Sequence, residues 1–312
     1  MRIGFGVDLG GTTVKIAAFT QEGKLLCKWE IPTVTAGNGK QILPDIAAAV
    51  LGYCREQNIA KSHVMGLGIG VPGPVDGNGI VAACENLGWG RVDVCSVLGA
   101  LTGFSVKAGN DATVAAVGEC WKGGGQGCQN MIMVTLGTGV GGGIVLDGKP
   151  LHGVRGAAGE IGHMVLNRNE TRACACGKKG CVEQYCSATG IARMASDYLA
   201  ESQEDSGLRK LEKITAKDVF EAAKAGDEIA QKVLEQVYAY MGEFIANICM
   251  VLNPEQVVIG GGVSKAGDVL IDGIKRHFNR YVYHVSGEDV EFKLAKLGND
   301  AGVYGAFKLI ME

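Results

Sequence analysis

Apolar runs separated by glycine-rich turns predict the same strand plan twice in this chain. Residues 3–19 contain two apolar runs around a Gly/Thr turn, and a polar turn then leads to a third run at residues 25–29. Residues 131–146 repeat this plan. Because Gly10 and Gly137 occupy matching turns 127 positions apart, we expect an internal duplication, with one copy in each of two lobes. Two unrelated tight hairpins are the alternative, since a lone glycine motif is a weak signal.

Helices and strands alternate in the rest of the pattern. Helices are expected at 42–57, from Asn110, after the capping box Thr215–Asp218, at 228–252, after Gly260–Ser264 and at 301–311, and further strands at 64–71, 104–108 and 256–259. No long linker interrupts this order, so the expected architecture is two α/β lobes facing one cleft. We place the lobes at residues 1–112 and 113–300 and expect the helix at 301–312 to pack back on the first lobe.

Composition favours a globular protein with a small-molecule partner. The 312 residues are 47% hydrophobic and 20% charged, and the formal net charge is −3. No Lys/Arg-rich run marks a surface for nucleic acid or an anionic membrane, and no run of about 20 apolar residues predicts a spanning helix. The N-terminal residues do not read as a signal peptide. The 11 cysteines are therefore expected to be mostly reduced, in the cytoplasm.

Three cysteines within eight residues, Cys174, Cys176 and Cys181, predict a structural zinc site. Zn²⁺ takes four nitrogen or sulfur ligands in a tetrahedron, so a fourth ligand is needed. His163 and Cys186 are the candidates. If a helix begins near Cys181, residue 186 is rotated from it by about 140°, which favours His163. The alternative is a set of buried free thiols, because cysteine also packs as a small hydrophobe.

Glycine and threonine residues in three turns predict contacts to a nucleotide. Such turns expose backbone N–H groups and hydroxyls that suit phosphate oxygens, and the duplication suggests two sides of one triphosphate. The nucleotide-facing candidates are Gly10, Gly11, Thr12 and Thr13 in the first turn, Gly137, Thr138 and Gly139 in the second, and Gly260, Gly261 and Gly262 beside the nucleoside. Asp8, at the end of the first strand, could hold Mg²⁺ through water.

Carboxylates near these turns predict acid–base chemistry and sugar binding. Asp111 is the candidate for the base that takes the proton of an alcohol acceptor, although an aspartate at a helix start could equally be its N-cap. Glu160 and Glu183 flank the cysteines and could accept hydrogen bonds from vicinal hydroxyls; simple solvation is the alternative for both. His163 could direct one ring nitrogen to zinc and the other to a sugar hydroxyl.

Together these motifs resemble the ROK family of sugar kinases and repressors, within the actin-like ATPase superfamily. They are Asp8-Leu-Gly-Gly-Thr-Thr13, Pro72-Gly-Pro74, Glu85-Asn-Leu-Gly-Trp89, Asn110-Asp-Ala112, Leu136-Gly-Thr-Gly-Val-Gly-Gly-Gly143, Gly159-Glu-Ile-Gly-His163, the Cys174–Glu183 segment, Ile259-Gly-Gly-Gly262 and Gly298-Asn-Asp-Ala-Gly302. The match runs along nearly the whole chain, and it is most similar to the bacterial glucokinase branch. Cys186 departs from the family pattern, in which this position is usually small and apolar.

The resemblance implies the duplicated, ribonuclease H-like two-lobe fold with a central cleft, and a set of site residues. It implies Asp111 as the catalytic base, sugar contacts from Gly73, Asn86, Asn110, Asp111, Glu160, His163 and Glu183, and structural zinc on His163, Cys174, Cys176 and Cys181. It also implies ATP and Mg²⁺ as cofactors and a homodimer.

The expected function is ATP-dependent phosphorylation of the 6-hydroxyl of glucose. Another hexose, such as N-acetylmannosamine, mannose or allose, stays open as the substrate, and polyphosphate stays open as the donor. A sugar-responsive repressor is the second class of function. Family repressors carry a DNA-binding helix-turn-helix before the first strand, whereas here only two residues precede Ile3, so we expect an enzyme.

Overall fold

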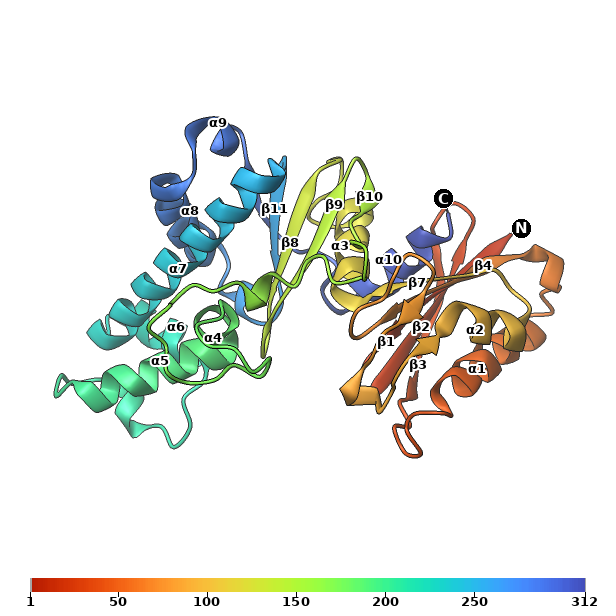
Figure 1. Cartoon of the computed structure of the whole chain (residues 1–312), viewed down its shortest axis with the longest axis horizontal. Coiled ribbons are helices and arrows are strands. Elements are labelled where there is room, and N and C mark those ends of the chain that lie inside the picture. Colours follow the sequence, from red (N-terminus) through yellow and green to blue (C-terminus); the bar gives the residue numbers. More distant parts are fainter. Residues whose placement is uncertain (1, 312) are drawn as a thin grey trace. The chain divides into compact units, whose positions relative to one another are not determined.

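The strands of the computed structural model, which describes residues 2–311, form two five-stranded sheets. The first contains β1 (Ile3–Leu9), β2 (Thr13–Thr20), β3 (Leu25–Pro32), β4 (Val64–Val71) and β7 (Val106–Asn110), in the order β3-β2-β1-β4-β7. The second contains β8 (Met131–Leu136), β9 (Val140–Leu146), β10 (Lys149–Pro150), β11 (Gln256–Gly260) and β12 (Glu291–Leu294), in the order β10-β9-β8-β11-β12. Figure 1 shows both sheets. Strand order is therefore the same in both, as the duplicated strand plan predicts.

Parallel pairing follows the hairpin in each sheet. β1 pairs in parallel with β4 and β4 with β7, while β8 pairs in parallel with β11 and β11 with β12. A further two-stranded sheet joins β5 (Ile80–Val81) to β6 (Val92–Asp93).

Every helix that the pattern predicts is present, and α2, α4, α5 and α9 are found in addition. They are α1 (Ile42–Glu56), α2 (Val94–Thr102), α3 (Asp111–Lys122), α4 (Glu183–Cys186), α5 (Ala188–Glu201), α6 (Ala216–Lys224), α7 (Glu228–Leu252), α8 (Asp268–Tyr281), α9 (His284–Gly287) and α10 (Ala301–Leu309). The start of α6 carries the predicted capping box between Thr215 and Asp218. Short 3₁₀ helices include those at Glu85–Leu87, Ile161–His163 and Val263–Ala266.

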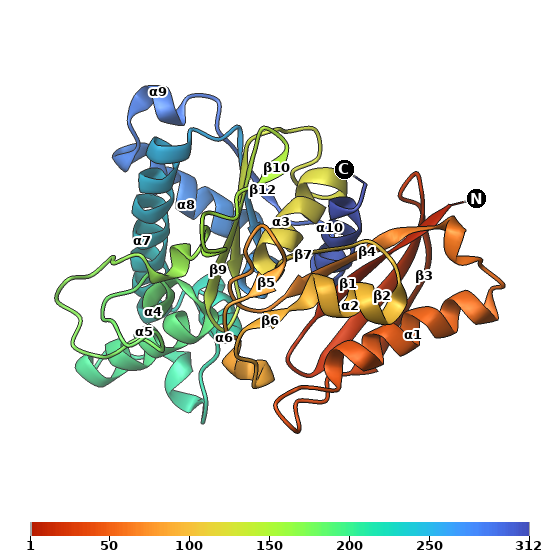
Figure 2. The same cartoon turned by 45° about the vertical axis from the view of Figure 1, so that its right-hand side comes forward.

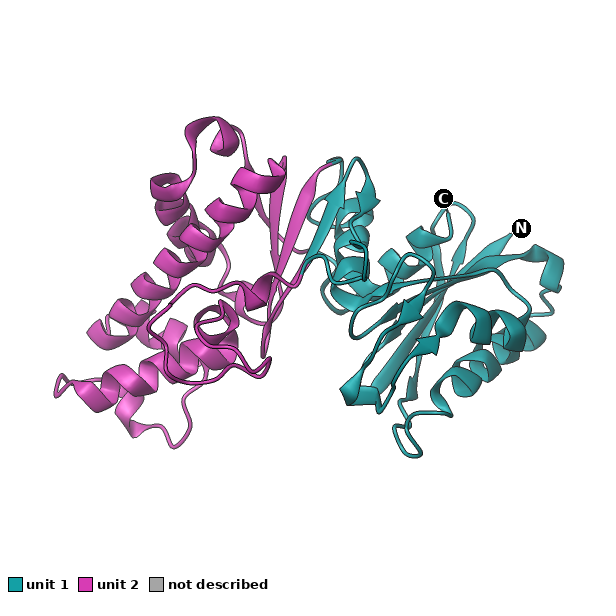
Figure 3. Ribbon diagram, in the orientation of Figure 1, with its two compact units in different colours: residues 1–129, 143–159, 296–312 teal, residues 130–142, 160–295 magenta. Residues whose placement is uncertain are grey.

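The chain divides into two compact units, coloured separately in Figure 3. Unit 1 contains residues 1–129, 143–159 and 296–312, and unit 2 contains residues 130–142 and 160–295. The division differs from the expected one at residues 112 and 113, because α3 packs on α10 inside unit 1. The division also passes through β9, after Gly142.

In unit 1, α10 packs unusually close to β1 and α3, as the two views in Figures 1 and 2 show. A Cβ added at Gly6 of β1 would lie 2.0 Å from the carbonyl oxygen of Val303, and one at Gly305 would lie 1.7 Å from that of Val114. Because glycine has no side chain, the backbone of α10 contacts the backbones of β1 and α3 directly at these positions. Side chains alternate along β1, so Phe5 and Val7 enter the other core, with α1 and α2, while Gly6 faces α10.

The core of unit 2 lies between its sheet and α5, α7 and α8. α7 supplies much of this core, including Phe244 and Ile245, which are about 1% exposed. α7 and α8 approach closely because Gly273 lies against the ring of Tyr238. Burial of such large apolar side chains is the main term that stabilises the unit.

Glu119 of α3 is a fully buried carboxylate that binds two separate segments of unit 1. Its Oε2 accepts hydrogen bonds from the N–H groups of Gly124 (2.7 Å) and Lys296 (2.9 Å), and its Oε1 accepts one from Leu297 (2.8 Å). Lys296 is the first residue of unit 1 after the chain leaves unit 2 for the second time, at residue 295. Glu119 therefore fixes the ends of unit 1 where the chain enters and leaves unit 2.

The substitution Glu119→Gln should lower the free energy of unfolding by about 2–3 kcal/mol. An amide NH₂ would then face a buried N–H donor, which leaves polar groups unpaired. Urea unfolding measures the change. Glu221→Gln on the exposed side of α6 is the matched control and should leave the transition unchanged. Equal stability of the two variants would contradict the assigned role of Glu119.

Candidate functional site

The first glycine turn is held in place by hydrogen bonds from the end of β3. Gly10 N donates to Thr13 O (3.0 Å), while the hydroxyl of Thr33 donates to Gly10 O (2.7 Å) and Thr33 N donates to Thr12 O (2.9 Å). Gly11 and Thr12 are exposed. The turn thus presents backbone and a hydroxyl to solvent on a fixed framework, as a phosphate site requires.

Asp8 lies beside this turn, opposite Lys15 in the β1–β2 register. The Lys15 Nζ is 3.6 Å from Asp8 Oδ2. Burial raises the pKa of Asp8, and the Lys15 ammonium offsets part of that effect. A Cβ at Gly302, in the first turn of α10, would lie 2.6 Å from Asp8 Cγ, so the carboxyl group packs against the start of that helix. A partly exposed carboxylate of this kind fits a Mg²⁺ ion that keeps most of its waters.

Asn110 and Asp111 form the junction between β7 and α3. Asn110, not Asp111, is the N-cap, since its Oδ1 accepts a hydrogen bond from Thr113 N (3.1 Å). Its Nδ2 donates to Gly73 O (3.1 Å) and to Asp111 Oδ1 (2.9 Å). Asp111 Oδ1 also accepts from Ala112 N (2.8 Å). The capping alternative for Asp111 is therefore wrong, and three of the expected sugar contacts of unit 1 lie together.

Asn86 lies on an exposed 3₁₀ turn, Glu85–Leu87, that belongs to the same region of unit 1. A Cβ at Gly73 would lie 2.9 Å from Ala83 O, so the Gly73 backbone packs on the segment that leads to Asn86. Trp89 anchors this segment by donating a hydrogen bond from Nε1 to Gly39 O (3.1 Å).

In unit 2, the second glycine turn contacts Glu183. Gly137 N donates to Gly139 O (3.0 Å), and Val140 N donates to Glu183 Oε2 (3.2 Å). The other oxygen, Oε1, accepts a hydrogen bond from the thiol of Cys174 (3.6 Å). Glu183 therefore connects the turn at residues 137–139 with the cysteines, and the simple solvation of this carboxylate is excluded.

The third glycine turn, Gly260–Gly262, begins with the last residue of β11 in the same unit. Gly261 has a φ of 83°, and a Cβ there would lie 2.5 Å from Leu136 O. The turn therefore packs its backbone on the end of β8. Only a 3₁₀ helix follows at once, and α8 begins later than the sequence suggests.

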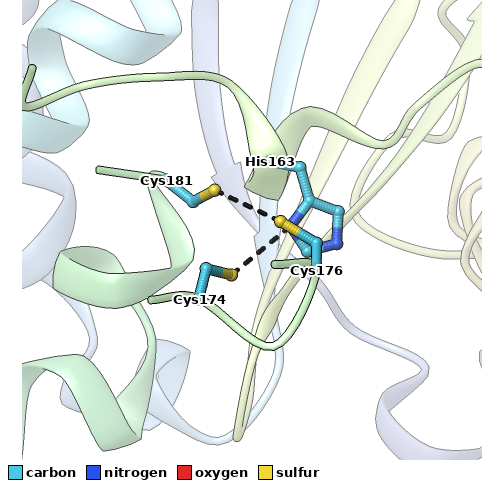
Figure 4. A group of neighbouring side chains, drawn as sticks. All are labelled: His163, Cys174, Cys176 and Cys181. Carbon is cyan, nitrogen blue, oxygen red and sulfur yellow. Dashed lines mark hydrogen bonds between the residues drawn. The ribbon is translucent and has the colours of Figure 1, made fainter. Parts of the chain in front are cut away.

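His163, Cys174, Cys176 and Cys181 converge on one point, as Figure 4 shows. Their ligand atoms lie within 4.8 Å of one another. His163 Nδ1 is 3.8 Å from Cys174 Sγ, and Cys176 Sγ is 3.6 Å from Cys181 Sγ. Zn–S bonds of about 2.3 Å in a tetrahedron place neighbouring ligands about 3.8 Å apart, so the donor set fits Zn²⁺. The other nitrogen of His163, Nε2, is 4.0 Å from Glu160 Oε2.

The surroundings of the three cysteines shift the pKa values of their thiols in different directions. Burial raises the pKa of Cys181 to about 12 and also raises that of Cys174, whereas the Lys178 N–H lowers the pKa of Cys176. Buried thiols of this kind ionise only when a cation replaces their protons. Cys186 lies outside the group, in the apolar core of unit 2 and 0% exposed, so it is not a ligand in this arrangement.

Two buried polar side chains brace the cysteine loop, residues 163–181. Gln184 Oε1 accepts hydrogen bonds from Gly180 N (2.8 Å) and Cys181 N (3.1 Å). Glu170 accepts hydrogen bonds from the hydroxyl of Tyr185 and from Arg172. Although burial raises it, the pKa of Glu170 is lowered to about 2 by these donors. The loop is therefore ordered by hydrogen bonds to Gln184 and Glu170.

Several of these supporting residues were not predicted from the sequence. Lys15 could have been found, since a hairpin closed by Gly10–Thr13 pairs residue 8 with residue 15. Thr33 could not, because no local pattern marks a side chain that binds a turn 23 positions away.

The duplicated sheets and the two glycine turns define an α/β protein with the actin-like ATPase fold. The sequence matches the ROK family over residues 4–312, and the chain belongs to this family. The predicted fold class and family are thereby confirmed.

Three relatives illustrate the similarity. A glucokinase from Halalkalibacterium halodurans is 45% identical over 311 residues, which cover 98% of this chain and 94% of the relative. The structure of a ROK family glucokinase from Streptomyces griseus in complex with glucose and AMPPNP is 32% identical, with a TM-score of 0.75 and 98% of each chain covered. The ROK hexokinase from Thermus thermophilus is 29% identical, with a TM-score of 0.78 and 98% and 96% covered.

Among the helices of the described residues, none combines the length and the hydropathy that crossing a membrane would need.

Exchange of Gly180 for alanine should destabilise the cysteine loop far more than exchange of Gly177. Both glycines have positive φ, 76° and 80°, so both variants carry backbone strain of about 1–2 kcal/mol. Only at residue 180 would the new Cβ meet another atom, Asn167 O at 1.9 Å; nothing lies within 4 Å at residue 177. Urea unfolding of the two variants tests the difference, and equal losses of stability would refute the packing argument.

Proposed function

We propose that this protein is a hexose kinase that transfers the γ-phosphoryl group of Mg·ATP to the 6-hydroxyl of glucose. The observation that carries the proposal is the placement of Asp111 at the first position of α3, beside two groups expected to bind the sugar, Asn110 and Gly73. The 45% identity to a glucokinase over nearly the full chain supports glucose as the acceptor.

Asp111 would act as the general base. Hydrogen bonds from Asn110 Nδ2 and Ala112 N to its Oδ1 fix the orientation of the carboxylate. A carboxylate held in this way can accept the proton of the 6-hydroxyl as the oxygen attacks phosphorus. Besides this proton acceptor, phosphoryl transfer requires mainly that the protein positions the two substrates and stabilises the charge on the phosphates.

The glycine turns would stabilise the charge on the phosphates. N–H groups and hydroxyls of residues 10–13 and 137–139 would bind the phosphate oxygens, and Gly260–Gly262 would lie against the nucleoside. Mg²⁺, when bound, neutralises part of the phosphate charge, and Asp8 would hold it through water. Lys15, which is paired with Asp8, would keep that carboxylate ionised.

The sugar-binding groups would be Glu160, His163 and Glu183 in unit 2. In unit 1 they would be Asn86, Asn110 and Gly73. His163 suits this role because Nδ1 faces the thiols while Nε2 faces Glu160. Structural zinc on His163, Cys174, Cys176 and Cys181 would fix the two peptide segments that carry the carboxylates. A homodimer and a cytoplasmic location stay predictions from the family resemblance and the cysteine usage.

The substitution Asp111→Ala should lower kcat by about 10²-fold or more while glucose binding stays measurable. The reason is that the base acts in the transition state, whereas several other groups hold the sugar. A coupled assay gives kcat, and calorimetry gives the affinity for glucose. Asp205→Ala, at an exposed position, is the control.

The wild-type protein, assayed with glucose, mannose, allose and N-acetylmannosamine and with ATP or polyphosphate, gives the substrate. Near-normal turnover of the Asp111→Ala variant would eliminate the assigned base. Preference for another hexose would leave the base in place and change only the acceptor.

One zinc ion per chain is expected in the purified protein, and removing it should lower both stability and sugar affinity. Elemental analysis should find the metal in wild type and in Cys186→Ser, and find it lost in Cys181→Ser. This pair separates the ligand from a thiol that is equally buried. Full stability and activity of a metal-free preparation would contradict the structural role of zinc.

A further inference from the structure

Two further thiols, those of Cys120 and Cys128, lie close together in unit 1. Cys120 is in the last turn of α3, and Cys128 follows the glycine-rich loop at residues 123–127. Their Sγ atoms are 3.8 Å apart. The Cys120 thiol approaches Cys128 O at 3.4 Å, and the Cys128 thiol donates to Gly125 O at 2.8 Å. Both cysteines are thiols in the structure.

The intervening loop can let the two sulfurs meet. A disulfide has an S–S length of about 2.05 Å, so the sulfurs must approach by about 1.8 Å. Four of the five residues at 123–127 are glycine, and glycine adapts its backbone at little steric cost. Cys120 is partly exposed and Cys128 is only 4% exposed, so an oxidant in solution reaches Cys120 first.

We infer that Cys120 and Cys128 are a redox-active pair that a hydroperoxide converts to a disulfide. The Cys120 sulfur attacks one peroxide oxygen, the O–O bond breaks, and a sulfenic acid and one water form when hydrogen peroxide is the oxidant. The Cys128 sulfur then displaces the sulfenic oxygen, which leaves with the thiol proton as a second water. The two thiols lose two electrons and the peroxide gains them. A dithiol reductant reverses the reaction by thiol exchange.

The disulfide acts on the segment that Glu119 holds. Cys128 must turn its sulfur away from Gly125 O, which shifts the loop that contains Gly124. Gly124 N donates one of the three hydrogen bonds that satisfy Glu119, and the same oxygen of Glu119 binds Lys296 N. Oxidation therefore weakens the attachment of both segments that lead to and from unit 2. The expected consequence is a reversible loss of turnover, which rests on the proposed kinase function.

Peptide mapping tests the disulfide without reference to activity. Trypsin cleaves after Lys107, Lys122 and Arg155 but not between Lys149 and Pro150, so Cys120 and Cys128 are the single cysteines of peptides 108–122 and 123–155. After brief treatment with hydrogen peroxide and blocking of the remaining thiols, mass spectrometry should find these peptides cross-linked. Dithiothreitol before blocking should abolish the cross-link. Peroxide-treated protein without this cross-linked pair would overturn the inference, even if no kinase activity is found.

The effect on turnover is measured with variants in which the candidate metal ligands are unchanged. Wild type and Cys27→Ser, whose cysteine is exposed elsewhere in unit 1, should lose turnover on oxidation and regain it with dithiothreitol. Cys120→Ser and Cys128→Ala should keep their turnover under the same treatment. Zinc release is measured in parallel. Equal inactivation of Cys120→Ser and wild type, or a mapped disulfide with unchanged turnover, would overturn the link to Glu119. Hydrogen exchange at Gly124 and Lys296, expected to accelerate on oxidation, reports the same link independently of catalysis.

Discussion

The chemistry of unit 1 depends on the close contact of α10 with β1 and α3. At Gly6 and Gly305 the backbones approach so closely that no Cβ could be accommodated. This contact places the start of α10 against Asp8 and fixes the axis of α3, whose first residue is Asp111. A side chain at either glycine would push the helices apart and move both carboxylates. The absence of side chains at Gly6 and Gly305 therefore sets the positions of Asp8 and Asp111, which lie far apart in sequence.

In unit 2, polar contacts position the candidate site residues. Two glycines with positive φ, Gly177 and Gly180, give its cysteine loop the curvature that brings the thiols together. Gln184 and Glu170 satisfy the backbone and side-chain donors of the loop. Glu183 extends this ordered region to the glycine turn at residues 137–139. The loop is thus a rigid support for polar groups without a helix or strand of its own.

Periodicity and turn residues were sufficient to predict most of the fold. The bounds of α7 and the capping box of α6 follow from local side-chain chemistry, and the repeated hairpin follows from its glycines. The metal group also came from sequence, because three thiols on a tight turn have few other uses. The division into units could not be predicted from the sequence, since the contact of α3 with α10 joins residues nearly 200 positions apart. Contacts of that kind leave no periodic trace in the sequence.

Side-chain partners separate the structural carboxylates from those available for chemistry. Glu119 has three backbone donors, and Glu170 has a tyrosine hydroxyl, backbone N–H groups and an arginine, which hold its pKa at about 2. A carboxylate with the lowered pKa of Glu170 is a poor proton acceptor, because its charged form is already the stable one.

Asp8 differs from both, since burial raises its pKa and a single ammonium group compensates only in part. A second cation in place of bulk water would lower the free energy of the charged carboxylate further, which is the condition for an ion-binding group. Sequence alone does not distinguish these carboxylates, because Asp8 in β1, Glu119 in α3 and Glu170 in a loop lie in ordinary segments that do not reveal their partners. The number and charge of the hydrogen-bond donors around each carboxylate distinguish them.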